Sequence, residues 1–198
     1  FFFIGVLRYY KGLHTLIQAA RQVKARIVIA GSGPEGERLK GLAEQLGARN
    51  VLFAGQVSDT EKVAVLKRCR ALVLPSHMRS EAYGMVLVEA SIFGRPQVSC
   101  EIGTGTSFVN AHGESGLVVP PEDEAALANA LNTLLTDDAL ADALGRGARA
   151  KLVHARRAVL GRHQPRAGAG GGRAGPGNGN ALGGHAAAFD TYAVPRPT

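Results

Sequence analysis

Short apolar segments rich in strand-forming residues recur along the chain, and they constrain its fold more than any other feature. Each is too short for a helix, and they lie at 1–5, 26–31, 50–55, 71–75, 96–101 and 116–119. Stretches with helical periodicity lie between and after them, at about 11–24, 35–47, 59–70, 84–94, 104–111, 122–135 and 137–150. This alternation predicts an α/β fold, a Rossmann-like parallel sheet with helices on both faces.

Several boundaries of these segments carry their own signals. Ser58 stands three residues before Glu61, which predicts a capping box at a helix start, and Gly47 and Gly94 stand where helix C-caps are expected. In a parallel sheet of this kind, ligands bind at the carboxyl ends of the strands, where loops lead into helices. We therefore expect functional residues in those loops.

The composition changes near residue 152. Arg, Ala, Gly and Pro dominate from there on, so we predict one folded domain at 1–151 and a disordered or aberrant tail at 152–198. The tail is either a linker or an out-of-frame translation of a GC-rich gene. Residues 1–150 hold 16 Lys/Arg against 15 Asp/Glu, whereas 151–198 hold 7 against 1. The basic charge thus belongs to the tail, which lacks interleaved aromatic residues, and we expect no nucleic-acid partner.

Composition also restricts the cellular setting. No apolar run is long enough to span a membrane, and the two cysteines lie inside apolar segments. We expect a reducing, cytoplasmic location. The sequence begins without Met and directly in an apolar segment, so we expect it to be a fragment of a longer chain.

Two carboxylates flank a predicted helix start in residues 80–90, Ser-Glu-Ala-Tyr-Gly-Met-Val-Leu-Val-Glu-Ala. If the helix begins near Gly84, Glu81 lies on the preceding loop and Glu89 lies about one and a half turns in. The first-turn amides of Gly84, Met85 and Val86 would then suit a diphosphate. By themselves, the two glutamates could equally be solvated surface residues.

This stretch resembles the E-x-seven-E signature of the retaining group-one, or family-four, glycosyltransferases of the GT-B type. Further segments are similar to that family in the same order, at 4–13, 26–36, 102–110 and 113–121. The resemblance covers roughly residues 1–150. It implies the C-terminal, donor-binding half of a GT-B fold.

The resemblance also implies roles for individual residues. Glu81 would hydrogen-bond the transferred sugar, Glu89 would bind the ribose hydroxyls, and Lys11 would neutralise the leaving diphosphate. No metal is expected, because Lys11, Arg8 and a helix N-terminus can neutralise the diphosphate and no Asp-x-Asp pair is present. The family commonly has Arg where this chain has Val6. Arg8 could compensate if an extended strand places residues 6 and 8 on one face.

The reaction implied is hexosyl transfer from a nucleotide-sugar to a glycan or lipid-linked acceptor, with retention at the anomeric carbon and without a cofactor. The sequences of residues 6–11 and 103–110 most resemble mannosyltransferase-like members of the family in bacterial polysaccharide biosynthesis. GDP-mannose is therefore the first donor to test. The family places acceptor recognition on an N-terminal domain that is absent here, so we expect this chain alone to lack turnover. A location at the inner face of the membrane is compatible with such acceptors.

Two other functions remain open. Residues 31–36 satisfy the G-x-G-x-x-G fingerprint, which is typical of an NAD-dependent oxidoreductase, although the next predicted strand, 50–55, runs into Gln56-Val57 without the acidic residue expected at its end. We interpret Gly33 and its neighbours instead as a tight turn lining the donor cleft. A non-catalytic nucleotide-binding module is the second alternative. The histidines, including His77, show no metal-ligand spacing and are expected at the surface.

Overall fold

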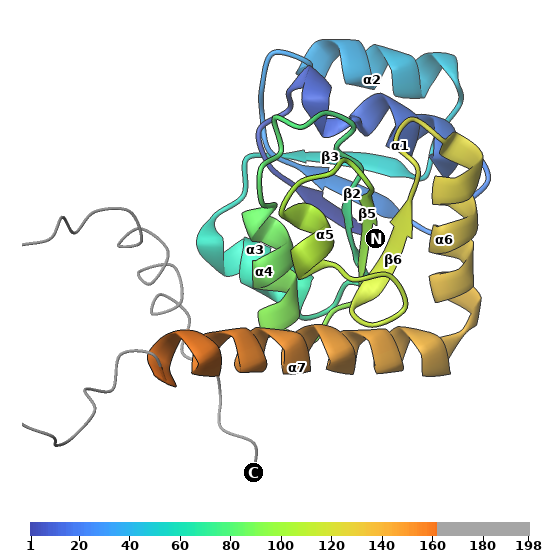
Figure 1. The fold of residues 1–198 in the computed structure, drawn as a ribbon. Helices are drawn as coiled ribbons and strands as arrows, with labels where there is room; N and C mark the ends of the chain where they lie inside the picture. The colour runs from blue at the N-terminus through green and yellow to red at the C-terminus, as the bar shows by residue number, and fades with distance from the viewer. Residues whose placement is uncertain (162–198) are drawn as a thin grey trace, which may run out of the picture. The chain divides into compact units, whose positions relative to one another are not determined.

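The computed structural model describes residues 1–161, which contain a sheet and its covering helices (Figure 1). The strands are β1 Phe2–Ile4, β2 Ile27–Ala30, β3 Val51–Gly55, β4 Leu72–Leu74, β5 Gln97–Cys100 and β6 Gly116–Val119. The α-helices are α1 Leu13–Ala20, α2 Gly36–Gln45, α3 Asp59–Leu66, α4 Met85–Ile92, α5 Thr106–Val109, α6 Glu124–Thr136 and α7 Asp138–Gly161. A short 3₁₀ helix, η1, spans Tyr9–Lys11.

All six strands pair in parallel in the order β3-β2-β1-β4-β5-β6. Connections from β1 run outward to β2 and β3, and the chain then returns to the middle of the sheet and runs outward the other way through β4, β5 and β6. The carboxyl ends of β1 and β4 therefore form the topological switch point, where sheets of this type leave a crevice for ligands. The predicted Rossmann-like sheet is confirmed, as is the position of each predicted strand.

The helices cover both faces of the sheet. Helix α1 packs against α2 and α6, whereas α3, α4 and α5 lie together (Figure 1). Right-handed crossovers require this division, because the two halves of the sheet are wound in opposite directions. Strand residues are consequently buried on both faces, as with Phe2 and Phe3 of β1 and Leu72, Val73 and Leu74 of β4.

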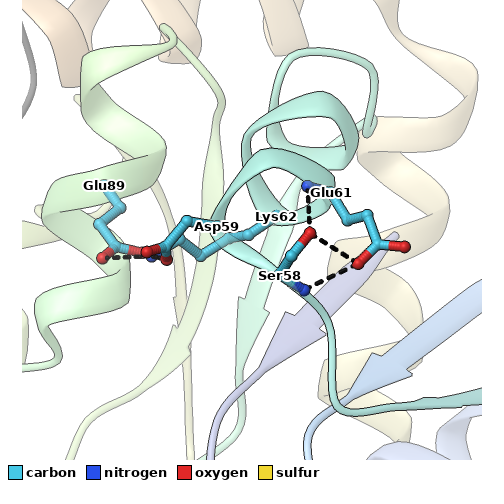
Figure 2. Close-up of polar contacts among 5 residues, drawn as sticks. All are labelled: Ser58, Asp59, Glu61, Lys62 and Glu89. Atoms are coloured by element: carbon cyan, nitrogen blue, oxygen red, sulfur yellow. Dashed lines mark hydrogen bonds and ion pairs between the residues drawn. The ribbon is translucent and has the colours of Figure 1, made fainter.

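Local signals in the sequence set several helix ends. The Ser58 hydroxyl accepts the Glu61 amide at 3.2 Å, and the Glu61 carboxylate accepts the Ser58 amide at 2.7 Å, which is the predicted capping box (Figure 2). Gly47 and Gly94 follow α2 and α4 in left-handed conformation, with φ of 63° and 61°. Both predicted C-caps are confirmed.

Three helices depart clearly from their expected bounds, and one of them is α3, which ends at Leu66 rather than near residue 70. Helix α1 begins at Leu13, because Gly12 is left-handed with φ 66° and a Cβ there would lie 2.0 Å from the Pro75 carbonyl oxygen. Helix α7 continues to Gly161, past the boundary expected after residue 151. Residues 162–198 of the predicted tail lie outside the described residues. Within the described part of the chain, no helix has the length and hydropathy needed to cross a membrane.

Candidate functional site

Lys11 and Glu81 meet at the switch point. Lys11 ends the short helix after β1, Glu81 lies on the loop after β4, and the lysine ammonium donates to the Glu81 Oε2 atom. The buried Ser76 hydroxyl donates to the same oxygen at 3.1 Å. Both charged side chains are nearly buried, with exposed fractions of 13% and 11%. The two residues expected to be catalytic are thus neighbours, and Ser76 supports the Glu81 carboxylate.

The main chain around Glu81 is fixed by the loop after β5. The Thr104 hydroxyl donates to the Glu81 carbonyl oxygen at 2.8 Å, and the Gly105 amide donates to the Ala82 carbonyl oxygen at 2.9 Å. A Cβ at Gly105 would lie 2.6 Å from the Tyr83 ring, so only glycine permits this close approach. The sequence does not predict that Ser76 or Thr104 supports Glu81, because their hydroxyls stand in no pattern that points to this role.

Helix α4 begins where the sequence places it, after Gly84. Its first-turn amides, those of Met85 and Val86, precede the first helical hydrogen bonds and are available to an anion as in any helix. Gly84 has φ 69°, and its missing Cβ faces Leu74 and Leu87 at 2.9 Å, so packing against the core also requires glycine.

Glu89 lies further along α4 and is ion-paired across to α3. Its carboxylate is 3.2 Å from the Lys62 ammonium, which also lies 3.1 Å from the Asp59 carboxylate (Figure 2). The Glu89 side chain is 23% exposed, and that of Asp59 is 91% exposed. The glutamate expected to bind ribose is therefore partly exposed and lies next to a cation that the sequence pattern did not indicate.

Arg8 and Val6 do not lie on a common strand face. Strand β1 ends at Ile4, and the Arg8 amide donates to the Val6 carbonyl oxygen at 2.9 Å, so the backbone turns between them. Both residues are exposed. Strand geometry therefore does not place Arg8 on the same face as position 6, where the family has arginine, and only the exposed position of Arg8 close to Lys11 in the sequence supports a phosphate contact.

The glycine-rich segment after β2 is explained by packing between two loops. A Cβ at Gly33 would lie 2.5 Å from the Leu7 carbonyl oxygen, and one at Gly31 would lie 1.9 Å from the Gly5 carbonyl oxygen. The Glu35 amide donates to the Leu7 carbonyl at 3.1 Å. The G-x-G-x-x-G segment at residues 31–36 thus follows β2, which lies one strand away from the switch point. Its glycines allow the loop after β2 to contact the loop after β1. This arrangement does not favour dinucleotide binding.

A cluster of aromatic rings adjoins the ion pair. Tyr9 stacks on His14 with centroids 5.6 Å apart, and His77 meets both rings edge-on at 4.9 and 5.2 Å. Both ring nitrogens of His77 are buried without a hydrogen-bond partner, so the expectation of a surface histidine is wrong for this residue. Burial, followed by His77 and Arg38, lowers the pKa of His14, whereas Glu122 opposes that shift.

Metal-binding groups do not gather in the part of the chain that the structure describes. Within residues 1–161, no three His, Cys, Asp or Glu side chains come close enough to hold a metal ion. The two cysteines are buried thiols whose pKa values are raised by burial, to about 11 for Cys69 and about 12 for Cys100. They act as core residues.

Comparison with known proteins agrees with this arrangement. D-rhamnosyltransferase WbpZ of Pseudomonas aeruginosa is 49% identical over 151 residues, which cover 76% of this chain and 40% of the relative. The O-antigen chain mannosyltransferase C of Escherichia coli is 45% identical over 149 residues, covering 75% of this chain and 40% of the relative. The chain thus spans about two fifths of the length of these relatives.

A solved structure shows the same fold. The Anabaena protein HepE, in complex with UDP, superposes with a TM-score of 0.70 at 25% identity, over 81% of this chain and 47% of HepE. The model of the family described as glycosyl transferases group 1 matches residues 1–151. This chain therefore belongs to the group 1 glycosyl transferases.

Proposed function

We propose that this chain is the donor-binding half of a retaining hexosyltransferase. The observation that carries the proposal is the Lys11–Glu81 pair at the switch point, directly before the N-terminus of α4. Family membership and the UDP complex of HepE support a nucleoside diphosphate as the bound part of the donor. The relatives that transfer mannose or rhamnose support GDP-mannose as the first donor to test.

In this proposal Glu81, Lys11 and Glu89 contact different parts of the donor. Glu81 accepts a hydrogen bond from the transferred sugar and stabilises the positive charge that develops on it, since a carboxylate held in a nearly buried site interacts strongly with charge. Lys11 moves its ammonium group from Glu81 to the leaving diphosphate. Glu89 accepts hydrogen bonds from the ribose hydroxyls, in exchange for its contact with Lys62.

The diphosphate is held without a metal or a cofactor. The amides of Met85 and Val86 and the positive end of the α4 dipole bind its oxygens. Gly33 lines the same crevice through its loop, and Arg8 contributes a second cation near Lys11. Because Val6 occupies the position of a family arginine, we expect the chain's diphosphate affinity to depend more on the helix terminus than on cations.

The acceptor in this proposal is a glycan or a lipid-linked saccharide. The chain spans 40% of the relatives, which supports a second domain that precedes it and completes acceptor binding. Turnover by this chain alone is not expected. A lipid-linked acceptor would bring the whole enzyme to the cytoplasmic face of the membrane.

Calorimetric titration of the chain with GDP, UDP, ADP and NAD tests the proposal. We expect one nucleoside diphosphate to bind, and Glu89→Ala to weaken it by about 1–3 kcal/mol, the cost of an unmade hydrogen bond to a charged group. Lys40→Ala, which removes an exposed ammonium on α2, is the control that should leave binding unchanged. Binding of NAD alone, or nucleotide binding unaffected by Glu89→Ala, would refute the proposal.

A further inference from the structure

An exposed aromatic ring lies next to the ion pair at the switch point. Tyr9 is 54% exposed although its ring is fixed by stacking on His14, with the ring planes inclined by only 8°. It stands two residues before Lys11 in the same 3₁₀ helix. A rigid, half-exposed aromatic ring suits the apolar C–H face of a pyranose, because tyrosine joins an apolar surface to a polar tip.

The Tyr9 ring packs against His77, whose buried ring nitrogens lack hydrogen-bond partners. His77 is held edge-on against both Tyr9 and His14. An unsatisfied buried polar group costs stability. In this position the imidazole holds the Tyr9 ring at a fixed angle beside the ion pair.

A carboxylate on a residue with an unusual backbone conformation lies at the edge of the same cluster. Glu122 precedes α6, and it is the one non-glycine residue within 1–161 that has a positive φ, at 59°. Its carboxylate is 59% exposed and lies 3.8 Å from the His14 Nε2 atom. Backbone strain concentrates where a side chain must be aimed, and a carboxylate beside an imidazole offers both an acceptor and a donor to sugar hydroxyls.

The cluster and the proposed nucleotide contacts belong to different groups of elements. Tyr9, His14 and Glu122 belong to segments that pack with α1 and α6, whereas Glu89 and Lys62 lie on α4 and α3 (Figure 1). The Lys11–Glu81 pair connects the two groups, because Lys11 shares η1 with Tyr9 and Glu81 lies on the loop that leads into α4. A donor bound on the α3–α4 side leaves the α1–α6 side open to a second sugar.

We propose that Tyr9, His14 and Glu122 form a carbohydrate subsite that holds the acceptor glycan. This inference rests on the proposed function. The Tyr9 ring supports the apolar face of an acceptor sugar, and the His14 imidazole and the Glu122 carboxylate hydrogen-bond its hydroxyls. His77 packs edge-on against the rings of Tyr9 and His14 and fixes their orientation.

Ligand-observed NMR titration of the full chain with α-mannotriose tests the subsite. Tyr9→Ala should weaken glycan binding about three- to tenfold, the loss expected for one stacking contact, whereas Tyr9→Phe should keep binding within about twofold. Glu122→Gln, at an exposed side chain, should weaken binding without reducing the melting temperature. None of these variants should alter the affinity for GDP or UDP.

Each result separates the subsite from the donor site. Glycan binding that is absent from the unsubstituted chain, or insensitive to both Tyr9→Ala and Glu122→Gln, overturns the subsite. Weakened nucleotide binding in Tyr9→Ala, with glycan binding intact, assigns the ring to the nucleotide and also overturns it. A chain that binds nucleotide in a Glu89-dependent way but not glycan retains the donor site, whereas glycan binding without nucleotide binding contradicts the proposed function.

Discussion

Lys11 and Glu81 are seventy residues apart in the sequence and form an ion pair between the segments that follow β1 and β4. The pair is nearly buried, and the Ser76 hydroxyl shares the same carboxylate oxygen. Removing either partner leaves a charge of low exposure unmatched. The arrangement therefore links the stability of this edge of the sheet to the residues proposed for catalysis.

A double-mutant cycle measures that link. Lys11→Met and Glu81→Gln should each reduce the free energy of unfolding by about 1–3 kcal/mol, and the double variant should lose clearly less than the sum. Urea unfolding provides the measurement. Lys40→Met and Glu37→Gln, an exposed pair on α2, are the matched control, for which a coupling of at most about 0.5 kcal/mol is expected. Additive losses at Lys11 and Glu81 would contradict the structural pairing.

Glu89→Ala should change stability little. Lys62 retains the Asp59 carboxylate at 3.1 Å, and the Glu89 side chain is partly exposed, so the expected loss is below about 1 kcal/mol. Thermal and urea unfolding of the variant check this. A larger loss would mean that weakened nucleotide binding in this variant reflects partial unfolding rather than lost ribose contacts.

Gly84→Ala should destabilise the chain more than Gly47→Ala. Both glycines are left-handed, with φ of 69° and 63°, so each substitution strains the backbone by about 1 kcal/mol. Only at Gly84 would the new Cβ overlap neighbours, Leu74 and Leu87, whereas nothing lies within 4 Å at Gly47. We expect a total of about 2–4 kcal/mol at Gly84 by urea unfolding. Equal losses would show that the core relaxes around the added methyl group.

The lowered pKa of His14 predicts an acid-sensitive stability. Burial disfavours its imidazolium form in the folded chain, assisted by His77 and Arg38 and opposed by Glu122. The unfolded chain, with a pKa near 6.5, then binds a proton more readily, so stability falls as the pH drops below that value and is unaffected above it. Melting temperatures between about pH 7.5 and 5 should decrease less in His14→Gln than in the unsubstituted chain. Parallel pH profiles would assign the acid sensitivity to other groups.

The fold could be predicted from the sequence because its signals are local. Apolar strands of three to five residues, helix caps such as Ser58 and the left-handed Gly47 and Gly94 are properties of short segments, and all were found in their expected places. The length of α7 was underestimated. Ala and Arg in residues 148–157 are strong helix formers, and they extend the helix although the sequence further on is rich in Gly and Pro.

The contacts of the site could be predicted only in part. Position relative to a helix start located Glu81 and Glu89 correctly, because that relation is also local. The partners of these residues, Lys11 and Lys62, come from other elements and depend on strand order. The turn between Val6 and Arg8 and the burial of the His77 nitrogens depend on packing between loops, which leaves no periodic pattern in the sequence.

The junction between β1 and β4 is short, with Phe2 and Leu72 as its one registered pair in the described sheet, whereas β1 aligns three residues with β2 and β4 aligns three with β5. The sheet is thus two three-stranded halves joined along a narrow seam. Lys11 follows a strand of one half and Glu81 follows a strand of the other, so their ion pair ties the halves together at the end of that seam. A diphosphate that draws Lys11 away from Glu81 would replace this side-chain tie between the halves with contacts of its own.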